Sequence, residues 1–317
     1  MKSFNHYIAA LLLWMICSVL AGQTYSKSLD ITGAGFYNEF FFETPRDPTH
    51  GRVEYVDQQT AQQHNLTYAT NGTFILRADY TTYLTPSDPG RKSVRIKSHK
   101  QFSTFVAIFD IRHMPVGCGT WPAVWMLGND WPNQGEIDIL EGVNSVSPNI
   151  ASLHTGSNCN MPPARNMTGQ SVGQDCAAYE TGNDGCGVQF VDHASFGHLF
   201  NNAQGGWYAV ERTTSDIKVY FWSRNDSSVP HQVGWSYDII EPDTWGQPAA
   251  AWSNEKCDFA DHFGPHSIMV NIAFCGDWAG AVYSQSGCPD TCENFVDTNP
   301  GSFYDAYFDF SGIRIYT

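Results

Sequence analysis

The sequence predicts an all-β protein built as a β-sandwich, and three observations support this prediction. Short apolar or alternating segments recur along the whole chain, separated by Gly, Pro and Asn. No long window has the periodicity of an amphipathic helix. Aromatic residues and glycine are abundant, with 20 Phe, 15 Tyr, 10 Trp and 28 Gly against only 17 Lys and Arg. Two packed antiparallel sheets bury such strands, and a final strand that returns to them fits a jelly roll.

The first part of the chain supplies four strand candidates, recognised by alternation or by apolar runs between turn residues. The expected strands are residues 33–44, 73–80, 93–98 and 102–109, and the expected loops are 45–51 and 84–91. The second of these loops contains two prolines, which interrupt a sheet because proline cannot donate to the ladder.

The second part of the chain follows the same pattern and ends in strand-like sequence. The expected strands are residues 151–156, 207–212, 215–224, 267–274 and 303–316, and the expected loops are 158–186 and 244–252. The loop at 158–186 is rich in Gly, Asn and Cys, and loops of this length are usually functional or held by cross-links.

Residues 135–142 (GEIDILEG) place three carboxylates within six positions, interleaved with aliphatic side chains. Side chains alternate along a strand, so Glu136 and Asp138 point to one face and the isoleucines to the other. Strict alternation would turn Glu141 into the core, where an unpaired carboxylate is costly. We therefore expect a β-bulge near 139–140, which restores the phase and brings all three carboxylates to one face.

This arrangement suits the hydrolysis of glycosidic bonds. A retaining glycosidase uses two carboxyl groups about 5–5.5 Å apart, one as nucleophile and one as acid/base. Glu136 and Glu141 are two same-face steps apart, about 6.6–7 Å each, so their side chains must lean together. Asp138, between them, could hydrogen-bond to Glu136 and tune its ionisation. The alternative interpretation is a solvated acidic edge strand, which seldom alternates so regularly with an aliphatic face.

Three tryptophans precede the acidic strand, at Trp121, Trp125 and Trp131. An aromatic ring can pack against the apolar face of a sugar, so these residues are candidates for substrate binding. Core packing is the alternative for each. The polar turn around Trp131 favours a role in binding, whereas the apolar neighbours of Trp125 are equally compatible with the core.

Residues 136–141 resemble the catalytic signature of glycoside hydrolase family 16, which reads Glu-aliphatic-Asp-aliphatic-(optional residue)-Glu. Leu140 fills the optional position, as in the laminarinase-type branch, and the surrounding segment is similar to laminarinases of filamentous fungi. The resemblance implies a concanavalin-like jelly roll with a substrate cleft on its concave face. It implies Glu136 as nucleophile, Glu141 as acid/base and Asp138 as assisting acid.

The resemblance also suggests three further substrate-binding residues. His154 matches a family histidine beside the carboxylates, Trp278 matches a position that lines the cleft, and Arg95 is a candidate for bonding sugar hydroxyls. A histidine satisfied within the sandwich and a tryptophan packed in the core are the alternatives for the first two. No metal or organic cofactor is required by this chemistry. We expect the negative charge of Glu136 to raise the pKa of Glu141.

The N-terminus predicts secretion. Lys2 precedes an apolar run at 7–20, so residues 1–21 are expected to be a signal peptide and 22–317 a single catalytic domain. A membrane anchor is the rival interpretation, but the run is short for a span of about 20 residues. The formal charge of −15 argues against nucleic acid and against an anionic membrane as partners. A neutral polysaccharide substrate and a monomeric, extracellular protein fit better.

The cysteines also suggest an oxidising compartment. Without Cys17, eight cysteines remain, which could form up to four disulfides in 105 possible pairings. The spacing of Cys288 and Cys292 could suit zinc, but no second Cys or His pair follows, so no metal site is expected. Sequons for N-glycosylation occur at Asn65, Asn71, Asn166 and Asn225.

Together these features predict a secreted retaining endo-β-glucanase that hydrolyses β-1,3-glucan of the laminarin type. Mixed β-1,3/1,4 and β-1,6-branched glucans are further possible substrates. A cell-wall glucan transglycosylase would use the same residues, with a sugar hydroxyl in place of water. A non-catalytic β-glucan-binding lectin could have the same fold, but it would not need both Glu136 and Glu141.

Overall fold

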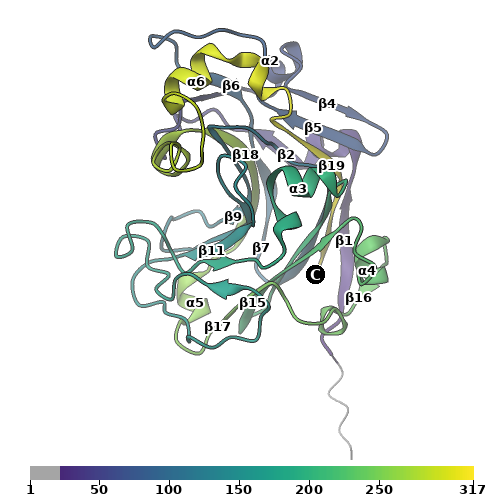
Figure 1. Ribbon diagram of the computed structural model, residues 1–317. Coiled ribbons are helices and arrows are strands. Elements are labelled where there is room, and N and C mark those ends of the chain that lie inside the picture. The colour runs from purple at the N-terminus through teal and green to yellow at the C-terminus, as the bar shows by residue number, and fades with distance from the viewer. Residues whose placement is uncertain (1–21) are drawn as a thin grey trace, which may run out of the picture.

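The computed structural model describes residues 22–317, which form two large antiparallel sheets packed face to face (Figure 1). The predicted all-β sandwich is confirmed. The expected signal peptide and Cys17 lie outside the described residues. No helix within residues 22–317 is long and apolar enough to cross a bilayer.

The first sheet has the strand order β16-β1-β19-β8-β14-β15-β17, with β5 beside β19 and β4 beside β5. Its strands are β1 (Tyr25–Ile31), β4 (Thr67–Thr70), β5 (Thr73–Arg77), β8 (Phe105–His113), β14 (Gly206–Arg212), β15 (Asp216–Ser223), β16 (Ile239–Ile240), β17 (Ala250–Ser253) and β19 (Tyr307–Tyr316). The strands predicted at 207–212 and 215–224 are confirmed as β14 and β15, which pair with each other.

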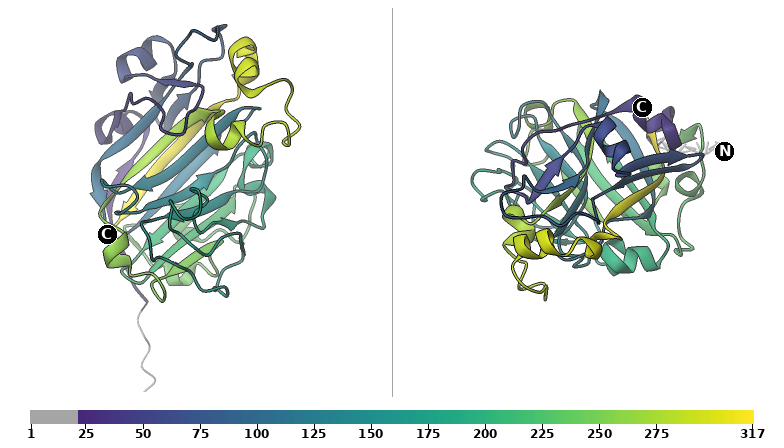
Figure 2. Two further views of the ribbon diagram at one scale, coloured as in Figure 1. Left: turned by 90° about the vertical axis from the view of Figure 1, so that its left-hand side faces the viewer. Right: turned by 90° about the horizontal axis from the view of Figure 1, so that it is seen from above.

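The second sheet has the order β12-β13-β11-β10-β9-β18-β7-β2. Its strands are β2 (Phe40–Phe42), β7 (Arg95–Phe102), β9 (Thr120–Leu127), β10 (Glu136–Glu141), β11 (Ile150–His154), β12 (Gln170–Ser171), β13 (Val188–Gln189) and β18 (His266–Phe274). A small parallel pair joins β3 (Val53–Tyr55) to β6 (Arg91–Ser93). The second sheet lies on the left in Figure 1, and Figure 2 (left) turns that side toward the viewer.

The helices are short and lie in the connections between strands. They are α1 (Phe36–Glu39), α2 (Gln58–Gln63), α3 (Gly197–Asn202), α4 (His231–Gly234), α5 (Phe259–His262) and α6 (Cys292–Thr298), with single turns η1 (Gly33–Gly35), η2 (His193–Ser195), η3 (Pro242–Thr244), η4 (Gly276–Gly280) and η5 (Pro300–Phe303). In Figure 1, α6 lies at one end of the second sheet and the teal loops beyond β11 lie at the other.

The main core lies between the two sheets and follows from the alternation of their strands. Phe109 and Phe310 face inward from the first sheet, and Val124, Ile137 and Ile268 face inward from the second. Because successive side chains point to opposite faces, these inward positions leave their sequence neighbours on the outer face. We call the outer face of the second sheet, which carries Glu136 and Glu141, the open face.

Three strand predictions need correction. Residues 33–39 form η1 and α1 rather than a strand, because Phe36 and Phe40 are four positions apart and both become fully buried through a helical turn. Residues 250–252 were expected in a loop but belong to β17, which pairs with β15. The last strand begins only at Tyr307, after the turn η5.

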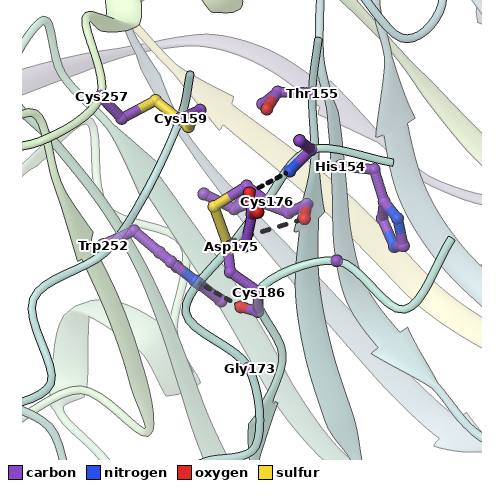
Figure 3. Close-up of a disulfide and its surroundings, with 12 residues drawn as sticks. His154, Thr155, Cys159, Gly173, Asp175, Cys176, Cys186, Trp252 and Cys257 are labelled. Atoms are coloured by element: carbon purple, nitrogen blue, oxygen red, sulfur yellow. Dashed lines mark hydrogen bonds between the residues drawn. A yellow bond between two sulfur atoms is a disulfide. The ribbon is translucent and has the colours of Figure 1, made fainter. Parts of the chain in front are cut away.

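The eight cysteines form four disulfides, as their even number predicted. The pairs are Cys118–Cys288, Cys159–Cys257, Cys176–Cys186 and Cys275–Cys292. Two of them hold the 158–186 loop: Cys159–Cys257 joins it to the segment after β17, and Cys176–Cys186 lies within it (Figure 3). The backbone N–H of Thr155 donates to the carbonyl of Cys176 at 2.8 Å, and the indole of Trp252 donates to the carbonyl of Cys186 at 2.9 Å. The prediction that this loop is clamped by disulfides is therefore confirmed.

Candidate active site

The three carboxylates of β10 lie on the open face because the strand contains the predicted bulge. Asp138 and Leu140 pair with consecutive residues of β9, which leaves Ile139 without a partner there. Ile139 and Leu140 are both fully buried, whereas Glu136 and Glu141 are partly exposed. One extra residue therefore spares Glu141 from the core.

Two rows of side chains cross the open face from these carboxylates, because paired residues of antiparallel strands point to the same side. Trp125, Met269 and Lys97 follow Asp138 across β9, β18 and β7, and Ala123, Asn271 and Arg95 follow Glu141. The predicted binding residues Trp125 and Arg95 thus belong to the same face as the carboxylates.

Each glutamate has its own indole donor. Nε1 of Trp131 donates to Oε2 of Glu136 at 2.5 Å, and Nε1 of Trp121 donates to Oε1 of Glu141 at 2.8 Å. The sequence suggested both tryptophans as sugar platforms, but it gave no sign that they bond to the carboxylates. The predicted Trp278 packs edge-on against Trp121, with ring centroids 5.7 Å apart.

Asp138 pairs with a histidine on the neighbouring strand. Nε2 of His154 lies 3.1 Å from Oδ2 of Asp138, and both side chains are buried. The prediction that Asp138 hydrogen-bonds to Glu136 is wrong, because within residues 22–317 Asp138 pairs with His154 instead. The reason is the register: His154 stands opposite Glu136 on β11, from where its ring reaches diagonally to the next same-face carboxylate.

The ionisation of the three groups reflects burial and crowding of like charge. Burial, followed by the charge of Asp138, raises the pKa of Glu136 to about 7. The same two causes hold the pKa of Glu141 well above its usual range, and the charge of Glu136, which the sequence suggested as the cause, contributes less. Burial lowers the pKa of His154, but its bond to Asp138 and the surrounding carboxylates outweigh this and raise it to about 9.

Trp125 and Arg95 are held by partners that the sequence did not reveal. Nε1 of Trp125 donates to Oδ1 of Asn271 at 2.7 Å, and the guanidinium of Arg95 lies 5.0 Å from the Trp125 ring centroid. Nε of Arg95 donates to Oε2 of Glu43 at 3.0 Å. Asn271 could have been found as a polar residue in the middle of an apolar run, whereas Glu43 had no such signal.

The 158–186 loop brings one more aromatic ring to the site. Tyr179 lies between the paired Cys176 and Cys186, is 74% exposed, and packs edge-on against Trp131 with centroids 5.8 Å apart. Nothing in the local sequence indicated this contact, because it depends on how the loop folds back over β11.

The remaining predicted sites lie away from the carboxylates. All four sequon asparagines, Asn65, Asn71, Asn166 and Asn225, are exposed. Their glycosylation stays a prediction. Within residues 22–317, no group of three or more His, Cys, Asp or Glu side chains is arranged to hold a metal ion, and Cys288 and Cys292 both belong to disulfides.

A two-sheet jelly roll whose open face carries an acidic strand flanked by tryptophans defines a class of carbohydrate-active enzymes. The chain belongs to glycoside hydrolase family 16, since the family model for the XgeA-like, catalytic GH16 domain matches residues 40–316. The family predicted from the sequence is therefore confirmed.

Solved structures of this family are closely similar. Laminarinase 16A from Phanerochaete chrysosporium, solved with 6-O-glucosyl-laminaritriose in its donor and acceptor sites, is 50% identical with a TM-score of 0.92. That comparison covers 93% of this chain and 100% of the laminarinase chain. An elongating GH16 β-1,3-glucosyltransferase is 37% identical, with a TM-score of 0.86 over 92% of this chain and 100% of its own.

Curated fungal relatives match most of this chain but are longer proteins. A probable glycosidase of Schizosaccharomyces pombe is 38% identical over 93% of this chain and 70% of its own length. The endo-1,3(4)-β-glucanase xgeA of Emericella nidulans is 37% identical over 93% of this chain and 48% of its own length. The chain thus spans about half the length of the curated endo-1,3(4)-β-glucanase.

Proposed function

We propose that this protein is a retaining endo-β-glucanase that hydrolyses β-1,3-glucan. The observation that carries this proposal is the open face of β10, where Glu136 and Glu141 flank the buried Asp138 and each accepts a hydrogen bond from an indole. Two carboxyl groups that differ in environment and share one face are what a double-displacement glycosidase needs.

In this reaction Glu141 acts first as an acid and Glu136 as the nucleophile. Glu141 protonates the oxygen of the leaving sugar while Glu136 attacks the anomeric carbon, forming a covalent glycosyl-enzyme. Glu141 then takes a proton from water, which breaks the bond to Glu136 with overall retention. Burial keeps Glu141 protonated for the first step by holding its pKa well above the usual range.

The Asp138–His154 pair controls charge in the site. With a pKa raised to about 9, His154 is a cation at neutral pH and offsets the charge of Asp138 at 3.1 Å. This makes it easier for Glu136, whose pKa is about 7, to ionise as the nucleophile. Asp138 is therefore an assisting residue rather than a reacting one.

The aromatic side chains around β10 are the proposed sugar-binding surface. Trp131 is 38% exposed beside Glu136, and Tyr179 adjoins it. On the other side, Trp121 and Trp278 form an edge-on pair beside Glu141. Sugar rings that bridge these two groups would place a glycosidic oxygen near both glutamates.

The substrate class rests on the solved relatives. Laminarinase 16A holds a β-1,3-glucan oligosaccharide with a 6-O-glucosyl branch, which supports β-1,3-glucan with tolerance of β-1,6 branches for this chain. The name of the Emericella nidulans relative supports activity on mixed β-1,3/1,4-glucan as well.

A second candidate function is transglycosylation, which one comparison favours. The elongating β-1,3-glucosyltransferase has 37% identity and a TM-score of 0.86 to this chain. Both reactions share the glycosyl-enzyme and differ only in whether water or a sugar hydroxyl accepts the glycosyl group. Longer oligosaccharides appearing early in the reaction would favour transfer, and their absence would favour hydrolysis.

Proton NMR of fresh laminarin digests, with lichenan and xyloglucan alongside, tests the proposal. Products that appear first as β-anomers support a retaining mechanism. Products that appear first as α-anomers, or binding of laminarin without any turnover, would overturn it. The Glu136→Gln variant, which keeps the side-chain size, should bind laminarin but not cleave it.

The same proposal places the protein outside the cell. Residues 1–21 would act as a signal peptide, the four disulfides suit an oxidising compartment, and the four exposed sequons would be available to glycosylation. Mass spectrometry of the secreted protein would test the cleavage and the glycans together. Size-exclusion chromatography would test whether the protein is a monomer.

A further inference from the structure

Asn149 makes two hydrogen bonds to the backbone of the bulge in β10. Its side chain is fully buried immediately before β11. Nδ2 of Asn149 donates to the carbonyl of Ile139 at 3.0 Å, and Oδ1 accepts from the backbone N–H of Glu141 at 2.9 Å. The side-chain amide therefore contacts the strand on both sides of Leu140.

The need for these bonds follows from the strand pairing. β11 pairs with β10 only as far as Ser152 opposite Asp138, whereas its other edge stays paired with β13 as far as Ile150 opposite Gln189. Beyond Asp138, this edge of β10 has no strand to satisfy its backbone groups, which would be costly in a buried position. A side-chain amide offers one acceptor and donors in nearly the geometry of a peptide group. Asn149 thus completes the hydrogen-bonding ladder where β11 turns away.

The backbone of Asn149 is held by two further hydrogen bonds. The backbone N–H of Asn149 donates to Oγ of Ser195 at 3.0 Å, and its carbonyl accepts from the N–H of Phe190 at 2.9 Å. The carbonyl of Ser195 in turn accepts a hydrogen bond from the hydroxyl of Tyr208, on β14 of the first sheet. A continuous chain of contacts therefore runs from the first sheet through Asn149 to the backbone of Glu141.

We propose that Asn149 is a positioning residue for the acid/base, acting through the bulge that it braces. This inference rests on the proposed role of Glu141. Within residues 22–317 the carboxyl of Glu141 has one hydrogen-bond partner, Trp121, so its direction depends on the backbone from which it projects. Asn149 sets that backbone by holding the N–H of Glu141 itself, and it does so without lying on the open face.

The Asn149→Leu variant removes both bonds at similar side-chain size. We expect kcat on laminarin to fall about 100-fold, the loss typical of a misplacement of about 1 Å. KM should stay within about twofold, because no sugar-binding residue is touched. Activity should be expressed per folded molecule, using circular dichroism to measure the folded fraction.

Azide distinguishes a misplaced acid/base from other faults. The substrate for this test is a dinitrophenyl β-laminaribioside, whose dinitrophenolate leaving group needs no proton. Azide can then attack the glycosyl-enzyme without help from a general base. The new C–N bond replaces the ester to Glu136, which leaves as a carboxylate, and the product is the β-glycosyl azide. Azide should therefore raise turnover by Asn149→Leu and Glu141→Ala, but not by Glu136→Gln.

The Asn149→Asp variant gives a second readout and covers the case in which Asn149→Leu fails to fold. A protonated carboxyl at this position can donate to the carbonyl of Ile139 and accept from Glu141, whereas an ionised one can only accept. Activity relative to wild type should therefore fall as pH rises. Glu136, Asp138 and His154 face the acid/base in both proteins, so this ratio isolates the new group.

Asn201 provides a matched control, since it makes the same kind of contact elsewhere. Its Oδ1 accepts from the N–H of Met114 at 2.9 Å, and its Nδ2 donates to the carbonyl of Met114 at 3.0 Å. None of its hydrogen bonds reaches β10. The Asn201→Leu variant should lose stability but keep kcat per folded molecule and show no response to azide.

The outcomes separate this inference from the proposed function. If Asn149→Leu and Asn149→Asp keep wild-type kcat and pH profiles, or if azide rescues Glu141→Ala but not Asn149→Leu, the inference is overturned. If Glu141→Ala itself retains full activity on laminarin, the acid/base assignment fails, and with it the proposed function. A 100-fold loss with azide rescue in Asn149→Leu supports both.

Discussion

The two indole donors allow the roles of the two glutamates to be tested by pH alone. Trp131 donates to Glu136 and Trp121 donates to Glu141, each through a single Nε1–H. Replacing either tryptophan by Phe removes that donor and keeps an aromatic ring. Because each bond is made to a carboxylate and favours its ionised form, both substitutions raise the pKa of the glutamate concerned.

The magnitude can be worked from the bond that is lost. A hydrogen bond to a charged group contributes about 1.5–3 kcal/mol, and about 1.4 kcal/mol corresponds to one pKa unit. Trp131 is 38% exposed, so water replaces part of the lost interaction and the lower end applies. We therefore expect Trp131→Phe to raise the pKa of Glu136 from about 7 by roughly one unit.

The two variants should move opposite limbs of the pH profile of kcat/KM. The nucleophile must be ionised, so a raised pKa of Glu136 shifts the acid limb of Trp131→Phe upward and narrows the profile. The acid must be protonated, so a raised pKa of Glu141 shifts the alkaline limb of Trp121→Phe upward and widens it. The glutamates interact, so each limb reports the pair, but the limb that moves still identifies the role.

The assay is kcat/KM on reduced laminarin between about pH 4 and 10, the range that spans the ordinary and the raised pKa values. If Trp131→Phe moves the alkaline limb and Trp121→Phe the acid limb, the roles of Glu136 and Glu141 are exchanged. If both variants lose activity without moving either limb, the indoles act only as sugar platforms, and the electrostatic reasoning is wrong.

Three further predictions follow from the same contacts. Glu136→Gln should lower kcat on laminarin at least about 1,000-fold. It should also raise the free energy of unfolding above pH 7, because the ionised Glu136, whose pKa the fold raises to about 7, destabilises the folded state there. Urea unfolding with unchanged or lower stability there would contradict this. The raised pKa of His154, about 9 against 6.5, contributes stability that is complete below pH 6.5 and lost as pH rises to 9. His154→Gln should destabilise the protein by about 3 kcal/mol at pH 6, and its stability should decline less steeply than that of wild type between pH 6.5 and 9, as measured by unfolding at several pH values. Replacing Cys176 and Cys186 by Ser opens a loop with a sequence separation of 10, which should lower the free energy of unfolding by about 3 kcal/mol. It should also raise KM for laminarin, because Tyr179 is no longer held beside Trp131. Unchanged urea unfolding would mean that backbone hydrogen bonds hold the loop instead.

The bulge was predictable because its causes are local. Alternation assigned Glu136 and the isoleucines to opposite faces, and the cost of burying Glu141 required one extra residue between Asp138 and Glu141. The bulge lies where this reasoning placed it, with Ile139 unpaired. The general fold was predictable for the same reason, since each strand shows its own periodicity in a few consecutive residues.

Contacts between distant segments could not be predicted in this way. The ion pair of His154 with Asp138 depends on the register between β10 and β11, and the disulfides depend on how loops far apart in sequence meet. The prediction of a strand at residues 33–39 failed for a different reason. Phe36 and Phe40 fit the two-residue period of a strand as well as the four-residue spacing of a helix, so only their packing decided between the two.

The carboxylates that the reaction needs also lower the stability of the fold around β10. Three carboxylates crowd one face of β10, and burial raises the pKa of both glutamates, so their ionised forms destabilise the fold. Indole donors and the His154 cation offset part of this cost without neutralising the site. The pairing of β10 with β11 ends just before the bulge, and Asn149 supplies the backbone hydrogen bonds there. The two indole donors, His154 and Asn149 therefore stabilise the fold around the carboxylates and also set the direction and ionisation of Glu136 and Glu141.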